Sequence, residues 1–217
     1  MCAPDCMSGG TTRNFQDAKS SITVPIWLAG WNILYTWVAV IVIAGIVGYA
    51  IDSAWTLGAL GFLAGPAVWF FGARYINDNY EPVLQGYLRD VEGRGREILG
   101  LAGENVASYT LKYKGDSPLL VSAAKEYRPT SLIVTDSSVA VYDDTELNMM
   151  MLNADVGTDT REMYYDQIST VNYSDPYLEL KTSDGDTMQY YSSRKPNDAL
   201  HDIQSRLREY KSASVGP

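Results

Sequence analysis

The sequence predicts a membrane helical hairpin followed by a mainly-β domain, a curled antiparallel sandwich or barrel with a C-terminal helix. Two apolar runs, 24–51 and 55–76, are each long enough for a membrane-spanning helix of about 20 residues. From residue 106 onward the hydrophobic period changes to two, in short segments. We therefore divide the chain into an N-terminal tail (1–23), a two-helix transmembrane hairpin (24–76), an amphipathic connector (77–102), the β domain (103–211) and a short tail (212–217).

The charge of the chain excludes nucleic acid as a partner. Its 217 residues carry 17 Lys and Arg against 26 Asp and Glu, and the acidic excess lies mostly in the second half. A negative domain without a basic stripe repels the phosphate backbone. Scarce Lys and abundant Asp are typical of proteins that stay soluble in concentrated salt. We expect a halophilic archaeal source, with an ordinary acidic protein as the alternative.

Both cysteines, Cys2 and Cys6, lie in the N-terminal tail. A Cys-x-x-x-Cys spacing without further Cys or a nearby His predicts neither a disulfide framework nor a zinc site. We expect a reduced, unstructured tail, with a thiol-linked lipid as the alternative.

The hairpin is predicted from two helices joined by a very short link. Pro25 suits the first turn of a helix over Val24 to Ile51, and only residues 52–54 separate the two runs. Small residues recur at a spacing of four, which lets two helices approach closely in lipid, although Gly and Ala are common in membrane helices anyway. The candidate helix-packing residues, within the hairpin or in self-association through it, are Ala44, Gly48, Gly61 and Gly65.

The ends of the apolar runs predict the orientation in the bilayer. Aromatic residues near these ends fit interfacial belts: Trp27, Trp31, Trp55, Trp69 and Tyr75. The connecting turn has no cation, whereas both flanks do: Arg13, Lys19, Arg74, Arg89, Arg94 and Arg96. The positive-inside rule therefore places both termini in the cytoplasm, in a multi-pass protein of the cell membrane.

The connector is expected to be an amphipathic helix leaving the membrane. Its apolar positions, Leu84, Leu88, Val91 and Ile98, fall near one helical face, and Asp90 with Arg94 forms an i, i+4 charge pair. Gly93 and Gly95 each cost about 1 kcal/mol relative to Ala, which predicts a broken stalk. The apolar face has three alternatives: the bilayer, the following domain or another copy of the chain.

The β domain shows its clearest hairpin between Leu178–Thr182 and Thr187–Tyr191. The Asp184-Gly185 pair suits a tight turn, and Leu178 and Leu180 face a core while their neighbours face water. A final helix begins near Pro196 and carries one apolar stripe, formed by Leu200, Ile203, Leu207 and Tyr210. We expect this helix to close the open end of the curled sheet.

Four segments in this order resemble the prokaryotic pleckstrin-homology-like (PH-like) domains: "RPTSLIVTDSSVAVY", "MYYDQISTV", "LELKTSDGDTMQYY" and the helix "PNDALHDIQSRLREY". The resemblance covers about half of the chain, and it implies a binding module. In that family, basic residues often follow Thr-Asp in the first turn, where this chain has Ser137 and Ser138. Phosphoinositide binding is therefore not carried over, and we expect a protein partner that contacts this turn.

The remaining cations of the domain are far apart in the sequence: Lys112, Lys114, Lys125, Arg128, Arg194 and Lys195. Scattered, solvated charges are the expected arrangement, with convergence in space as the alternative.

The string "LNMMML" contains the other candidate partner contacts, Met149, Met150 and Met151. We expect a half-buried strand with Met as filler. An adaptable apolar contact surface for a partner or lipid is the alternative.

The sequence offers no constellation for catalysis, a cofactor or a metal. His201 is the sole histidine, no Cys lies near it, and no phosphate-binding glycine loop is present. The Asn153–Glu162 loop fails the EF-hand spacing, because Gly157 and Tyr164 fall at the wrong positions. We expect a non-enzymatic membrane protein that presents a cytoplasmic binding or scaffolding domain. The alternative is a structural or accessory subunit of a larger membrane assembly.

Overall fold

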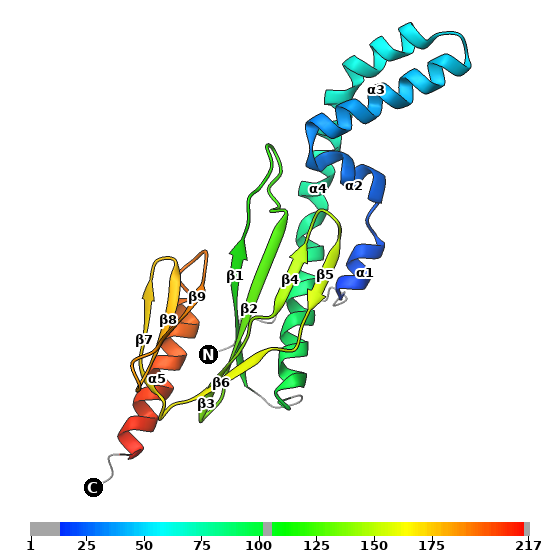
Figure 1. Cartoon of the computed structure of the whole chain (residues 1–217). Coiled ribbons are helices and arrows are strands. Elements are labelled where there is room, and N and C mark those ends of the chain that lie inside the picture. Colours follow the sequence, from blue (N-terminus) through cyan, green and yellow to red (C-terminus); the bar gives the residue numbers. More distant parts are fainter. Residues whose placement is uncertain (1–13, 102–105, 215–217) are drawn as a thin grey trace, which may run out of the picture.

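The computed structural model describes residues 14–101 and 106–214 and shows an elongated molecule, with an apolar helical hairpin projecting from a β-rich body (Figure 1). Cys2, Cys6 and Arg13 lie outside the described residues. The first half is helical: α1 (Phe15–Ser20), α2 (Val24–Trp31), α3 (Ile33–Ala50) and α4 (Ala54–Ile98). The expected N-terminal tail therefore contains a short helix, and Phe15 and Ala18 of that helix are buried.

The first apolar run forms two helices, so the prediction of a single helix was wrong. Asn32 has an extended backbone, and its side-chain oxygen accepts the N–H groups of Leu34 (2.9 Å) and Tyr35 (3.3 Å). This side chain caps α3 and satisfies donors that a helix start leaves free. Helix α2 then crosses α4 where two glycines meet, since a Cβ on Gly30 would lie 2.4 Å from the carbonyl carbon of Gly72.

Helices α3 and α4 pack tightly through small residues. A Cβ on Gly61 would lie 2.8 Å from that of Ala44, and a Cβ on Gly65 would lie 2.2 Å from the Trp37 ring. One on Gly48 would meet the backbone of residues 53 and 54. All four candidate helix-packing residues therefore lie inside the hairpin of one chain.

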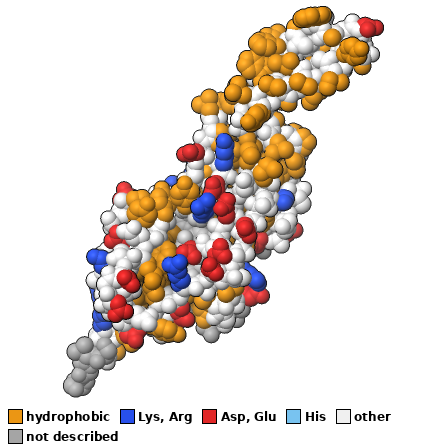
Figure 2. Space-filling model, viewed as in Figure 1, with side chains coloured by type: hydrophobic (Ala, Val, Ile, Leu, Met, Phe, Trp, Pro, Cys, Tyr) orange, Lys and Arg blue, Asp and Glu red, His pale blue; other side chains and the backbone are white. Residues whose placement is uncertain are grey.

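Both α3 and α4 contain a stretch that is long and apolar enough to cross a membrane, by length and composition. Only 11% of α3 is buried within the chain, and hydrophobic side chains cover the visible face of the hairpin (Figure 2). A core helix of a soluble protein would instead be mostly buried. Trp55 fits an outward position, with 94% of its surface exposed, whereas Trp27 and Trp31 are buried within the chain.

Helix α4 runs without a break for 45 residues, through the second apolar run and the connector. The prediction of a broken stalk was wrong, because burial of one helical face outweighs the glycine cost. Gly95 sits against the Tyr142 ring, where a larger residue would collide, and Gly93 has open space around it. The expected Asp90–Arg94 pair does not form: Asp90 accepts the N–H of Phe15 at 3.1 Å, and Arg94 pairs with Glu97.

Nine antiparallel strands and a C-terminal helix form the second half of the described chain, which confirms the mainly-β prediction at this level. The larger sheet has the order β5-β4-β2-β3-β6, with β1 also paired to β2, and the smaller sheet has the order β7-β8-β9. The strands are β1 (Ala107–Lys114), β2 (Glu126–Val134), β3 (Ser138–Tyr142), β4 (Thr145–Asn148), β5 (Asn153–Val156), β6 (Thr160–Tyr164), β7 (Ile168–Ser174), β8 (Tyr177–Thr182) and β9 (Thr187–Tyr191). Helix α5 (Asn197–Ser214) follows.

The β8–β9 hairpin matches its prediction closely. Leu178 and Leu180 are fully buried and Lys181 is exposed. Gly185, in the turn, has a φ of +95°, a left-handed conformation that glycine adopts without a steric penalty.

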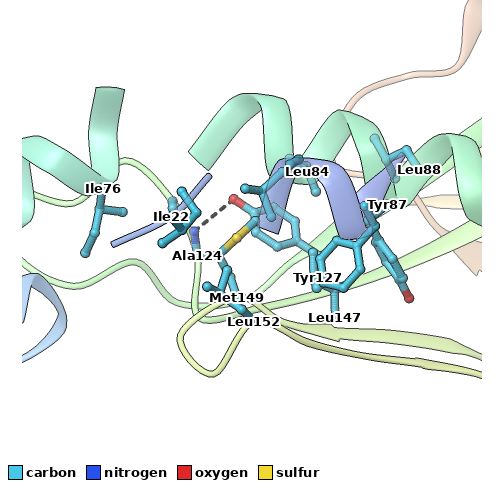
Figure 3. Packing of buried hydrophobic residues seen from close by; sticks show 14 of the residues in the cluster. Ile22, Ile76, Leu84, Tyr87, Leu88, Ala124, Tyr127, Leu147, Met149 and Leu152 are labelled. Atoms are coloured by element: carbon cyan, nitrogen blue, oxygen red, sulfur yellow. Dashed lines mark hydrogen bonds between the residues drawn. The ribbon is translucent and has the colours of Figure 1, made fainter. Parts of the chain in front are cut away.

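Two apolar cores lie on opposite faces of the larger sheet. One is enclosed by both sheets and α5, and it contains Leu132, Val141 and Ile203. The other lies between the sheet and helices α1, α2 and α4, where Tyr87, Tyr127, Leu147 and Met149 meet (Figure 3). Strand β3 is therefore buried at every position. The connector's apolar face packs on the β domain, one of the three alternatives that the sequence left open.

Candidate functional site

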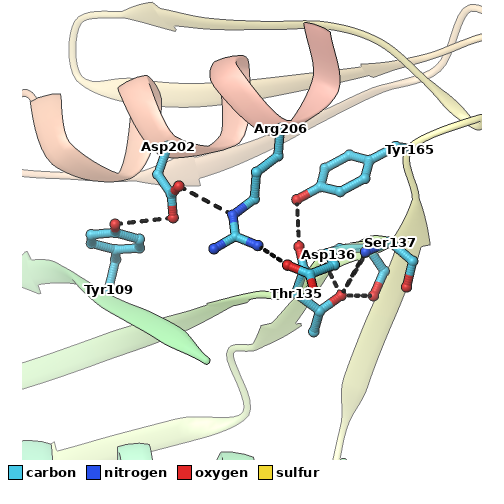
Figure 4. Close-up of polar contacts among 8 residues, drawn as sticks. Tyr109, Thr135, Asp136, Ser137, Tyr165, Asp202 and Arg206 are labelled. Carbon is cyan, nitrogen blue, oxygen red and sulfur yellow. Dashed lines mark hydrogen bonds and ion pairs between the residues drawn. The ribbon is translucent and has the colours of Figure 1, made fainter. Parts of the chain in front are cut away.

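The Ser137–Ser138 turn is part of a polar network at one end of the β domain (Figure 4). Ser137 is exposed, whereas Ser138 is buried and donates to a carboxylate oxygen of Glu162 at 2.6 Å. Arg206 of α5 pairs with Asp136 of the same turn and with Asp202 at 3.1 Å. A basic side chain thus reaches this turn from the C-terminal helix, but acidic neighbours on both sides already pair with it.

Two tyrosines complete this network. The Tyr165 hydroxyl donates to the Thr135 carbonyl at 3.0 Å, and the Tyr109 hydroxyl donates to Asp202 at 3.1 Å. Burial raises the pKa of Tyr165 to about 12, and burial together with the Asp202 charge raises the pKa of Tyr109. These groups stay protonated: Tyr165 ties the end of β6 to the β2–β3 turn, and Tyr109 ties β1 to α5, which is a structural role.

The three methionines lie in a turn between β4 and β5 rather than on a strand. Met149 is fully buried, and the Trp27 indole N–H donates to the carbonyls of Met149 (3.1 Å) and Met150 (3.2 Å). Met150 packs against the same core, and 60% of Met151 is exposed. The contact partner of this turn is therefore helix α2 of the same chain, and of the three side chains Met151 is the most available to another molecule.

A cleft with a volume of about 490 Å³ lies between helix α4, strands β1 and β2, and the β9–α5 loop. Four cations line it: Lys112, Lys114, Arg194 and Lys195. These residues were expected to be scattered, and the structure brings four of the six together. Glu81 is the one carboxylate among the lining residues, so the cleft is positive in a chain whose net charge is −9.

The local structure explains this convergence. Lys112 and Lys114 are two apart on strand β1, so their side chains leave the same face of the sheet. The N–H of Ser193 donates to the Lys112 carbonyl at 3.2 Å, which fastens the β9–α5 loop alongside β1. Arg194 and Lys195 follow in that loop directly before helix α5.

The electrostatics of the cleft favour an anionic occupant. Burial, with the nearby Arg194 charge, lowers the pKa of Lys112, and Glu81 offsets part of this effect. Within the described residues no ion pair involves Lys112, Arg194 or Lys195. Lys114 donates to the Ser122 carbonyl, a neutral acceptor. An anion would relieve the mutual repulsion of these side chains and replace water around partly buried charges.

The sequence contained only part of the signal for this cleft. Lys112 and Lys114 alternate on a predicted strand, which could have indicated a shared face, and Arg194-Lys195 stands next to a predicted helix start, which could have indicated a basic loop. Nothing local relates the two segments, because they are about 80 residues apart and meet through the sheet. The described residues contain no cluster of metal-ligating side chains, and His201 is exposed on α5.

No protein-family model and no curated protein matches this chain. Among solved structures, the C-terminal domain of an unknown protein from Leishmania infantum is similar over 54% of this chain and 97% of that chain. The identity is 18% and the TM-score is 0.37, a likeness that carries no inference about this chain.

Proposed function

We propose that this chain is a two-pass membrane protein whose non-enzymatic, PH-like β domain binds an acidic segment of a protein partner at the cytoplasmic face of the cell membrane. Helix α4 supports the proposal, because it joins the apolar hairpin to the β domain without a flexible link. A domain fixed in this way has a constant height and orientation above the bilayer. That is the property of a scaffold rather than of a tethered, freely rotating module.

The basic cleft is the observation that carries the partner chemistry. None of its cations forms an ion pair within the described chain, Glu81 is the one carboxylate in the lining, and Tyr80, Leu84 and Tyr127 are apolar lining residues beside them. This mixture suits an acidic peptide, whose carboxylates and side-chain carbons both find contacts.

The height of the cleft favours a cytoplasmic peptide over a lipid headgroup of the same membrane. The exposed apolar surface of α4 ends at Phe71, and the cleft is lined by α4 residues between Tyr80 and Gln85. At 1.5 Å per residue these lie roughly 13–21 Å further along the helix. A helix tilt of about 40° reduces this height to roughly 10–16 Å. The headgroup layer is only about 5–8 Å thick, so it does not extend to the cleft.

The full-length protein in lipid nanodiscs provides the test, with a fluorescent peptide of alternating Glu and Gly as the probe. We expect salt-sensitive binding that Arg194→Glu weakens at least tenfold. Lys181→Glu makes the same charge change on an exposed β8 position away from the cleft and should leave binding within twofold. Equal loss in both variants, or no binding by the parent protein, would overturn the proposed site.

The orientation is tested separately, with protease added to sealed vesicles. We expect degradation of the β domain only in inside-out vesicles. Degradation in right-side-out vesicles would refute the cytoplasmic placement, and release of the protein by alkaline carbonate would refute membrane integration.

Gentle detergent extraction tests the alternative of a larger assembly. A stable stoichiometric complex would favour a subunit of such an assembly over a scaffold with transient partners.

A further inference from the structure

The loop between β1 and β2, residues 115–125, presents two large apolar side chains to the outside. Leu119 is 74% exposed and Leu120 is 55% exposed, and these adjacent residues form the tip of the loop. The following residues, Val121, Ala123 and Ala124, are buried in the core beside α4. The loop is therefore anchored at its base, and its leucines are held outward rather than folded inward.

The conformation of this loop is fixed by helix α4. The Asn77 side chain donates to the Leu120 carbonyl at 2.9 Å and accepts the N–H of Ser122 at 2.7 Å. Leu120 itself has a φ of +61°, a left-handed conformation that is unfavourable for a residue with a branched side chain. Backbone strain of this kind persists where the surroundings hold it, and it often accompanies a function.

The position of Asn77 sets the height of the two leucines relative to the bilayer. On α4 the exposed apolar surface ends at Phe71, and the exposed pair Arg74–Asp78 follows. Asn77 lies between the members of that pair, about 9 Å along the helix from Phe71, and a tilt of about 40° reduces this to a height of roughly 7 Å. This places the tip of the loop next to the headgroup layer, which is about 5–8 Å thick.

Helix α2 supports the same level for the membrane surface. It crosses α4 at Gly72, and its outward residues Val24, Ile26 and Leu28 are each between 44% and 51% exposed. A short apolar helix at this height lies in the interface rather than across the bilayer. Figure 1 shows the β1–β2 loop extending from the β domain toward the hairpin, on the other side of α4 from α2.

We infer that Leu119 and Leu120 insert into the interfacial layer of the membrane and form a contact of the β domain itself with lipid. This inference rests on the membrane anchoring in the proposed function. With α2 on one side of α4 and the loop on the other, the domain is held on both sides of its supporting helix. Rotation about the hairpin axis is then restricted, and the basic cleft keeps a constant direction.

The test uses single-cysteine variants of the full chain in which Cys2 and Cys6 are replaced by Ser. An environment-sensitive dye is attached at Leu120→Cys, at Ile43→Cys in the exposed middle of α3, or at Asp184→Cys in the exposed β8–β9 turn. The proteins are reconstituted in phosphatidylcholine–phosphatidylglycerol vesicles that contain lipids spin-labelled near the headgroup or near the end of the acyl chain.

We expect blue-shifted emission at position 120 that headgroup-labelled lipid quenches, deep quenching at position 43, and neither effect at position 184. Quenching at 43 but not at 120 overturns the loop contact while anchoring stands. Absence of quenching at 43 overturns the anchoring itself. A blue shift at 120 that no lipid quencher affects shows a protein contact, by a partner or a second copy, and also overturns the inference.

Discussion

Trp27 provides the sharpest test of the contact between the helical half and the β domain. The sequence predicts that it belongs to an interfacial aromatic belt, where its loss would have little effect on the fold. In the structure it is fully buried, its ring lies 5.8 Å from that of Trp31, and its N–H donates to two carbonyls of the β4–β5 turn. Trp27→Ala separates these two interpretations.

The magnitude follows from burial. Replacing a buried Trp by Ala costs about 3–5 kcal/mol of unfolding free energy, of which the hydrogen bonding contributes about 1 kcal/mol. For a chain of this size, each kcal/mol shifts the melting temperature by about 2–4 °C. We therefore expect the melting temperature in detergent to fall by roughly 6–20 °C. Differential scanning fluorimetry measures this change.

Two matched variants complete this experiment. Trp55→Ala removes the same side chain from a position that is 94% exposed, and we expect almost no change in melting temperature. Trp27→Phe keeps an aromatic ring but loses the donor, and an intermediate decrease is expected. Hydrogen exchange should also increase at residues 149–152 in Trp27→Ala. Equal melting temperatures for Trp27→Ala and Trp55→Ala would refute the internal contact and favour the belt.

Three further predictions concern glycines and a buried phenol. Gly93→Ala should stabilise the protein by up to about 1 kcal/mol, because the new Cβ has no neighbour within 4 Å. Gly95→Ala should stabilise it less, or destabilise it, because its Cβ would lie 3.2 Å from the Tyr142 ring. Scanning fluorimetry compares the two, and equal gains would contradict the helix–sheet contact. Gly65→Leu should cost about 1–3 kcal/mol through overpacking, while Gly58→Leu, in open space, should leave the melting temperature and the protease resistance of the hairpin unchanged. The contribution of Tyr165 to stability is complete below pH 10 and is lost as pH rises toward its folded pKa of about 12. Tyr165→Phe should therefore make the melting temperature less sensitive to pH between these values. An unchanged dependence of melting temperature on pH would contradict this assignment.

The sequence predicts the periodic elements well and their relations poorly. The β8–β9 hairpin follows from alternation and an Asp-Gly turn, and α5 follows from a stripe that buries Ile203 and Leu207. The break at Asn32 was missed because an apolar run conceals a capping side chain within it. The continuity of α4 was missed because its glycines were assigned the cost of an isolated helix.

The candidate site shows the same division more clearly. All six cations of the domain were expected to be scattered, although Lys112 and Lys114 are two apart and Arg194 and Lys195 are adjacent in the sequence. A single hydrogen bond from Ser193 to the Lys112 carbonyl joins the two segments. Nothing in either segment alone encodes that contact.

The local chemistry was readable from the sequence alone: two stretches long and apolar enough to span a membrane, a mainly-β antiparallel half and a C-terminal amphipathic helix. These follow from hydrophobic periodicity, which depends only on near neighbours along the chain. Long-range packing, in contrast, brings Trp27 to the Met149 carbonyl, lays α4 over the second face of the larger sheet and gathers four distant cations in one cleft. Such contacts join residues dozens of positions apart along the chain. They therefore contribute stabilising free energy only when the whole chain has folded.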